Sequence, residues 1–167
     1  MGLPQLVVRL VVGVLMIGHG LQKLFGWFGG HGLEGTGQFF DSLGLRPGKQ
    51  AAVAAGAAEV GGGALLTLGL ATPLAVASLA GAVITGARTV HLKNGPWATE
   101  GGYEYNLVLL ATLFALAQTG PGPVSVDAAR GTVRKGFLWA LLALAAGTAG
   151  SFAATAIGAR SSDEPQI

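Results

Sequence analysis

The sequence predicts an all-α membrane protein, a bundle of four transmembrane helices with a fifth transmembrane helix near the C-terminus. Of the 167 residues, 51% are hydrophobic and only 11% are charged, and the mean hydropathy is +0.58. A soluble domain carries about 25% charged residues, so the composition excludes an ordinary water-soluble protein. The 29 glycines and the abundant alanine are typical of helices that pack closely against one another in lipid.

Five apolar runs account for the predicted spans, because a helix needs about 20 residues to cross the hydrocarbon core of a bilayer. The runs cover residues 4–25, 51–70, 73–91, 103–118 and 137–157. Only Ala71 and Thr72 separate the second run from the third, so these two runs should form an antiparallel hairpin. The fourth run is the shortest, and it ends before Pro121 and Pro123, which cannot continue a helix.

The segments around these runs carry weaker signals. No basic residue precedes the first run and no small-residue cleavage site follows it, so we expect a retained helix. Arg9 lies about 7–8 Å of helix rise from the start of this helix, close enough for its side chain to reach the lipid headgroups. Residues 38–43 are compatible with a short interfacial helix near Trp27, and His31 is interpreted as a solvated loop residue.

Polar residues interrupt four of the apolar runs, where ionisable side chains are costly unless they meet a partner or water. In the stretch Gly18–Lys23, His19 and Lys23 lie four residues apart and share one helix face, with Gln22 beside them. We predict an intramembrane polar site with no metal ion, made of nine residues: His19, Gln22, Lys23, Glu59, Arg88, His91, Glu104, Tyr105 and Asn106.

The alternation of five spans predicts that these residues converge. We name the side of the N-terminus and the 71–72 turn side A, and the opposite side, with the 26–49 and 93–102 loops, side B. The polar residues of the first, third and fourth spans all lie near side B, and Glu59 lies about 13–14 Å of helix rise from Lys49 at the same side. Side chains that reached for headgroups independently would be scattered over both ends.

Glu59 gives the strongest reason to expect a site. It lies too deep and is too short to reach water, so it must be paired, protonated or beside a wet cavity. Lys23 and Arg88 are its expected cationic partners. The structural alternative is an ion pair that only fixes how the helices pack.

The other residues have structural alternatives as well. Glu104 suits the first turn of a helix, where the N-terminal dipole favours a carboxylate. Lys23 and Arg88 could each extend to the headgroups, and His91 could lie at the interface. His19 could be a core histidine that is hydrogen-bonded to a carbonyl.

Three stretches carry a family resemblance: Gly18–Gly26 with a His-Gly-x-x-Lys signal, Ala57–Gly62 with a lone glutamate, and Glu104–Asp127. In these residues the chain resembles the DoxX family of small bacterial membrane proteins, over residues 5 to about 127. The resemblance implies a four-helix core within residues 1–127. The rest of the chain would then be a basic loop with the fifth helix (128–160) and a disordered polar tail (161–167).

The resemblance also implies an association with redox processes. The family is named for a sulfur-oxidation and quinol-oxidase context, and a related protein is a subunit of a thiosulfate:quinone oxidoreductase. Other members are tied to oxidative-stress complexes that contain soluble enzymes. The resemblance therefore implies a lipid-embedded chain in the bacterial plasma membrane with a partner protein of a membrane redox complex.

Two functional hypotheses rank nearly level, and neither assigns a catalytic residue. In the first, the chain is a quinone-handling or menaquinone-handling subunit: His19 and Lys23 donate hydrogen bonds, while Glu59 and Glu104 exchange protons. Because the chain has no cysteine and no nucleotide-binding Gly-x-Gly-x-x-Gly, the electrons would come from the partner. In the second, the chain is a non-catalytic anchor or assembly subunit for a partner enzyme.

Two further readings rank lower. One is a carrier for a small anion or sulfur compound, with Lys23 and Arg88 as its cationic lining. The other is haem ligation by His19 and His91, each of which has a simpler role. The basic residues form no phosphate-tracking stripe, so no nucleic acid partner is expected.

The orientation follows from one cluster of charges. Three basic residues crowd into 130–135 on side A, and the positive-inside rule favours such a cluster in the cytoplasm. We therefore expect a cytoplasmic N-terminus and a polar site that opens outward.

Overall fold

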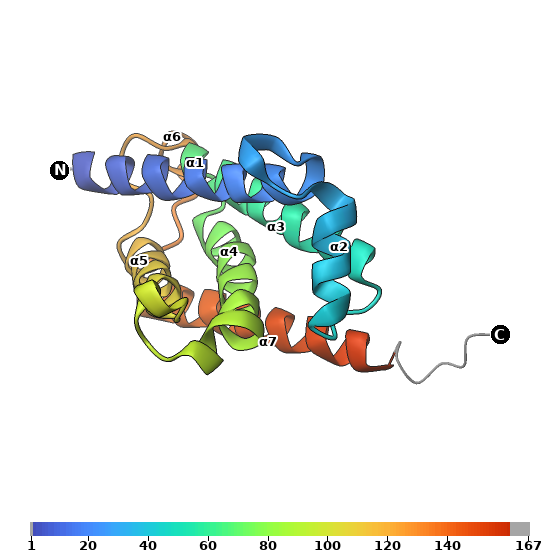
Figure 1. Cartoon of the computed structure of the whole chain (residues 1–167). Coiled ribbons are helices and arrows are strands. Elements are labelled where there is room, and N and C mark those ends of the chain that lie inside the picture. The colour runs from blue at the N-terminus through green and yellow to red at the C-terminus, as the bar shows by residue number, and fades with distance from the viewer. Residues whose placement is uncertain (1, 161–167) are drawn as a thin grey trace.

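The computed structural model describes residues 2–160, and within them every regular element is helical (Figure 1). The α-helices are α1 (Leu3–Phe25), α2 (Gly32–Ser42), α3 (Gly48–Leu68), α4 (Thr72–Gly86), α5 (Glu104–Thr119), α6 (Val126–Ala129) and α7 (Phe137–Arg160). A π-helical segment (Ala87–His91) and a short 3-10 turn (Leu92–Asn94) extend α4, and further 3-10 turns cover Trp27–Gly29 and Ala98–Glu100. The predicted tail at 161–167 lies outside the described residues.

Four helices are long and apolar enough to cross a membrane: Leu3–Phe25, Gly48–Leu68, Thr72–Asn94 and Phe137–Ala159. The fourth predicted span corresponds to α5, which has 16 residues and is shorter than a full crossing requires. The prediction of an all-α membrane bundle with a further C-terminal helix is confirmed.

The helix α4 lies at the centre of the bundle. It packs against α3, α5 and α7, while α1 packs against α3 on the side of α4 away from α7 (Figure 1). Apolar side chains of α1, α3, α4, α5 and α7 form one continuous core, with Leu66, Leu79 and Leu113 almost completely buried.

The interfacial helix is longer than predicted. It begins at Gly32 instead of residue 38 and ends at Ser42. Three glycines between 32 and 37 give this part of the chain little intrinsic helix propensity. The helix forms there because it packs against α3: Thr36 and Gly37 are buried, and a Cβ on Gly37 would lie 3.1 Å from the backbone of Lys49.

Arg9 does not reach the headgroups as expected; it is 2% exposed. Its guanidinium donates hydrogen bonds to the carbonyls of Leu66 (3.0 Å), Thr67 (3.2 Å), Val124 (3.0 Å) and Pro121. The last carbonyls of α3 lack the i+4 N–H groups that earlier carbonyls bond, and Leu66 accepts one bond from the cap N–H of Gly69, so these carbonyls can still accept from Arg9. Arg9 thus ties the end of α3 to the chain beyond α5, and the expectation was wrong because backbone carbonyls, and not headgroups, accept its hydrogen bonds.

Asp127 holds the start of α4 in place on side A. Its buried carboxylate accepts hydrogen bonds from the backbone N–H groups of Ala71 (3.0 Å) and Thr72 (3.3 Å) at the start of α4. Its own N–H donates to the carbonyl of Gly69. A carboxylate at this position satisfies orphan donors and complements the helix dipole. The α3–α4 turn is therefore held on side A by α1 and by the 121–127 segment together.

Candidate intramembrane polar cavity

An ion pair joins the first two long helices. The Nζ atom of Lys23 on α1 lies 2.7 Å from Oε2 and 2.9 Å from Oε1 of Glu59 on α3. The Glu59 side chain is 9% exposed and the Lys23 side chain 24% exposed. The predicted pairing of Glu59 with Lys23 is confirmed.

Glycine allows the two backbones to approach closely enough for this pair. A Cβ on Gly20 of α1 would lie 2.6 Å from the carbonyl oxygen of Gly56 on α3, which is closer than side-chain carbons come to backbone. Further along the same interface, a Cβ on Gly13 would lie 2.8 Å from the carbonyl oxygen of Gly63. Close glycine-mediated packing brings Lys23 within reach of a carboxylate one helix away.

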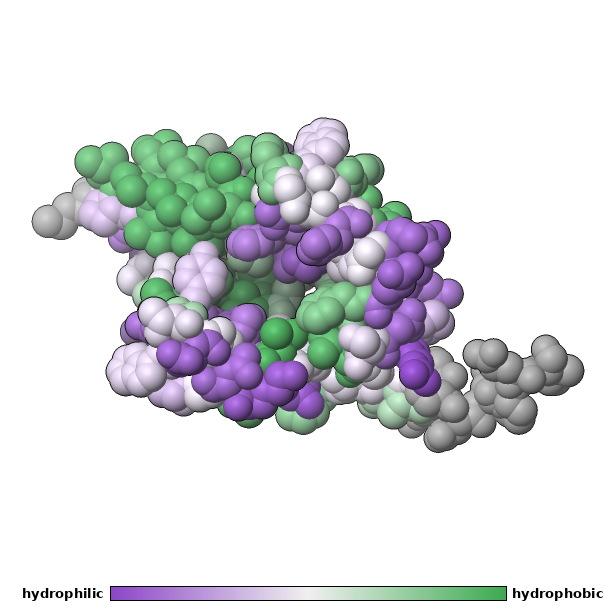
Figure 2. Space-filling model, viewed as in Figure 1, coloured by the Kyte–Doolittle hydropathy of each residue, from purple (hydrophilic) through white to green (hydrophobic). Residues whose placement is uncertain are grey.

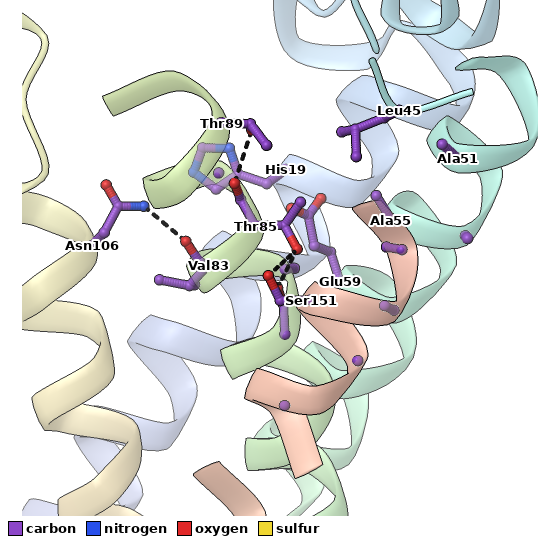
Figure 3. Close-up of a pocket in the computed structure, with 18 of the residues that line it drawn as sticks. His19, Leu45, Ala51, Ala55, Glu59, Val83, Thr85, Thr89, Asn106 and Ser151 are labelled. Carbon is purple, nitrogen blue, oxygen red and sulfur yellow. Dashed lines mark hydrogen bonds between the residues drawn. The ribbon is translucent and has the colours of Figure 1, made fainter. Parts of the chain in front are cut away.

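The ion pair lines a cavity of about 510 Å³. Figure 3 shows Glu59 and His19 facing the space between α1, α3, α4 and α7, and Figure 2 shows this face of the molecule hollowed below the apolar surface of α1. The walls are mostly apolar and come from α1, α2, α3, α4, α5 and α7. The predicted residues that line it are His19, Lys23, Glu59, His91, Tyr105 and Asn106.

The π-helical segment shapes one wall of the cavity. The Nδ2 atom of Asn106 donates a hydrogen bond to the carbonyl of Val83, 3.2 Å away, just before this segment (Figure 3). The imidazole of His91, at the end of the segment, lies 2.7 Å from the carbonyl of Gly101 through Nδ1. Both side chains are thus held by backbone carbonyls. Such single π turns inside α-helices occur frequently at functional sites.

Two polar groups of the cavity have no internal partner. Within residues 2–160, neither the imidazole of His19 nor the hydroxyl of Tyr105 makes a hydrogen bond, and both residues are exposed. By contrast, the hydroxyls of Thr85 and Ser151 bond each other across α4 and α7 at 3.0 Å. His19 and Tyr105 are therefore the side chains best placed to bind a ligand.

Three of the predicted residues do not line the cavity. Gln22 donates a hydrogen bond to the carbonyl of Phe28, so it holds the adjacent turn. Arg88 was expected to pair with Glu59, but its Nη1 donates to the hydroxyl of Ser151, 3.0 Å away, and its guanidinium lies 3.6 Å from the ring centroid of Phe152. The π-helical segment rotates Arg88 toward α7, and that expectation was wrong.

Glu104 lies in the first turn of α5, as its structural alternative expects, and it also bonds the preceding loop. Its Oε2 accepts a hydrogen bond from the backbone N–H of Ala98, 3.0 Å away, at the start of a 3-10 turn. Its side chain therefore orders the loop before α5. His19 and His91 both line the cavity from different helices, but the described residues hold no group of three or more potential metal ligands.

The fold and the cavity together define a multi-pass helical membrane protein with an internal ion pair. The model of the DoxX family matches residues 5–92, and the chain belongs to this family. It is 38% identical over 122 residues to the Bacillus subtilis (strain 168) protein named "Putative oxidoreductase CatD", an alignment that covers 73% of this chain and 83% of that protein. No solved structure matches the chain.

Proposed function

We propose that this protein is the membrane subunit of a redox complex in the bacterial plasma membrane and that its cavity receives the head of a quinone or menaquinone. The cavity carries the proposal: it combines apolar walls, two side chains without a partner in residues 2–160, and an ion pair whose carboxylate is buried. The relative named as an oxidoreductase supports the redox context.

The chemistry of the cavity suits such a ligand. A volume of about 510 Å³ lies within the range of small-molecule sites, about 300–1,000 Å³. A quinone head is a flat apolar ring with two carbonyl oxygens that accept hydrogen bonds. His19 on α1 and Tyr105 on α5 would donate to them from separate walls, while Lys23 is held by Glu59.

Reduction of a quinone to a quinol takes two electrons and two protons. The electrons would come from the partner protein of the complex. Protons would reach the oxygens through groups that can exchange them, and in the cavity these are His19 and the Lys23–Glu59 pair. The ring would stay out of water because the walls around it are mostly apolar.

Quinone binding by the purified protein tests the proposal. His19→Ala and Tyr105→Phe each remove one donor that has no partner among the described residues, so folding should be unaffected. His31→Ala is the matched control, because His31 is exposed in the loop outside the cavity. Loss of one hydrogen bond to the ligand costs about 1 to 1.5 kcal/mol, or roughly a ten-fold weaker Kd. Equal affinity in wild type and both cavity variants would contradict a quinone site here.

The same variants separate this function from a non-catalytic anchor. If a partner enzyme co-purifies and its quinone-dependent turnover falls with His19→Ala but not with His31→Ala, the cavity takes part in electron transfer. If turnover is the same in both, the chain anchors its partner and the polar residues serve the fold.

A further inference from the structure

Part of the cavity lies between α3 and α7, beside the polar residues. We call this part the tail slot; it is lined by small residues of the two helices: Ala51, Ala54, Ala55, Ala146, Gly150 and Ala154. Figure 3 labels Ala51 and Ala55 on α3, one turn apart among the residues that line the cavity. Residues 51–58 extend along about 10 Å of helix. The slot therefore has room for a narrow, elongated group.

Small residues elsewhere in this bundle bring helices into direct contact. A Cβ on Gly147 of α7 would lie 2.7 Å from the carbonyl oxygen of Ala77 on α4, and α1 meets α3 through Gly20 and Gly56 in the same way. Along the tail slot the small faces do not meet. A Cβ on Gly150 has no heavy atom within 4 Å, and Ala54, Gly150 and Ala154 are exposed.

The hydroxyl groups of α4 and α7 beside the tail slot already have hydrogen-bond partners. The hydroxyl of Ser78 donates to the carbonyl of Ala58 (3.0 Å), and that of Thr85 lies 2.8 Å from the carbonyl of Gly81 and 3.0 Å from the hydroxyl of Ser151. These groups leave no donor for a polar ligand, so the wall presents an apolar surface. The ion pair adjoins this wall, because Glu59 follows Ala55 by one turn of α3 (Figure 3).

We infer that the tail slot binds the isoprenoid tail of the quinone, with the head at His19 and the tail passing between α3 and α7 toward the lipid. This inference rests on the proposed function and adds to it that the ligand must carry a hydrocarbon tail. It also gives α7, which lies beyond the residues matched by the family model, a direct part in ligand binding. The tail enters the slot from lipid or detergent and not from water, so close packing against the slot, rather than removal from water, would supply its contribution to affinity.

A side chain placed in the slot tests the inference. Gly150→Leu fills open space in the slot, and leucine favours helix more than glycine does. Gly61→Leu is the matched control: Gly61 is also exposed in a spanning helix with no heavy atom within 4 Å of a Cβ, but it lies outside the cavity. Wild type and both variants, in one detergent, are titrated with a menaquinone that carries an isoprenoid tail and with tailless menadione. Partition into micelles cancels in the ratio of variant to wild type.

We expect Gly150→Leu to weaken binding of the tailed quinone about ten-fold, because the leucine side chain would occupy the space of the tail, and to leave menadione binding unchanged. Gly61→Leu should change neither. An unchanged affinity for the tailed quinone, or equal weakening for both ligands, would overturn the tail slot while leaving the quinone site intact. If wild type binds neither quinone, the proposed function fails and the inference fails with it. Co-purification of a phospholipid with wild type that is lost in Gly150→Leu, without any effect on quinone, would assign the slot to lipid and overturn the inference.

Discussion

The Lys23–Glu59 pair should couple the stabilities of α1 and α3 strongly. With charges 2.7 Å apart and an effective dielectric constant of about 20, the Coulomb attraction is about 6 kcal/mol. Desolvation of both groups opposes it, and the 24% exposure of Lys23 lets solvent screen part of it. We therefore expect a coupling free energy of about 2 to 3 kcal/mol.

A double-mutant cycle measures this coupling. Lys23→Met leaves a buried carboxylate and Glu59→Gln leaves an unpaired ammonium, so each single change should cost about 3 kcal/mol. With the expected coupling, the double variant should lose about 3 to 4 kcal/mol, and not the sum of about 6 that two independent changes would cost, because neither charge remains unpaired. Equilibrium unfolding of wild type and the three variants in one detergent supplies the four free energies.

The chain contains its own control pair. Lys49 and Glu34 lie 2.9 Å apart, but their side chains are 65% and 75% exposed, so their coupling should stay below about 1 kcal/mol. A coupling for Lys23 and Glu59 no larger than that of this surface pair would refute the argument from burial. The charge-free double variant has a second use: if it folds and still binds quinone as wild type does, the ion pair is structural.

Three further outcomes are expected. Arg9→Met should lower the free energy of unfolding by about 3 kcal/mol or more, because buried carbonyls lose their donors. The variant should also be cleaved faster by proteases in the chain beyond α5. Cleavage of the variant at the same rate as wild type would contradict this role of Arg9. Gly20→Ala should lower the melting temperature through the α1–α3 contact, whereas Gly18→Ala, where a Cβ meets nothing within 4 Å, should not; equal melting temperatures would contradict glycine-mediated packing. The native chain has no cysteine, so a single cysteine introduced by Lys93→Cys or Arg130→Cys can be labelled in intact cells. If side A is cytoplasmic, an impermeant maleimide should label Lys93→Cys and not Arg130→Cys. Labelling of Arg130→Cys alone would show the inverse orientation.

Hydropathy predicted the helices well because a bilayer imposes a length and an apolar composition on each span. The deep position of Glu59 predicted a cationic partner for the same reason, and Lys23 provides it. The choice between Lys23 and Arg88 could not be made in the same way. It depends on the rotation of each helix, and the π-helical segment at Ala87–His91 changes that rotation without any clear signal in the sequence.

The expectation that Arg9 reaches the headgroups was wrong for a related reason. An arginine near the end of a span suggests headgroups when the rest of the chain is unknown. Its actual partners come from the end of α3 and from residues 121–124, more than 50 positions away in sequence. The role of Asp127 as a cap could not be predicted for the same reason, because the helix that it caps, α4, begins 55 residues earlier. Residues whose partners are distant backbone atoms leave no periodic pattern to recognise.

The two ends of the bundle therefore differ in how their polar groups are satisfied. On side A, Arg9 and Asp127 bond backbone groups and connect three segments of chain, which leaves their charges no freedom to serve a ligand. On side B, His91, Asn106 and Glu104 are held by backbone atoms, while His19 and Tyr105 face the cavity with no partner in residues 2–160. A bundle closed by buried hydrogen bonds at one end can keep a cavity open at the other without losing its packing. If so, Arg9→Met should reduce stability without changing the relative affinity of the folded protein for tailed and tailless quinone. Gly150→Leu should change that relative affinity without reducing stability.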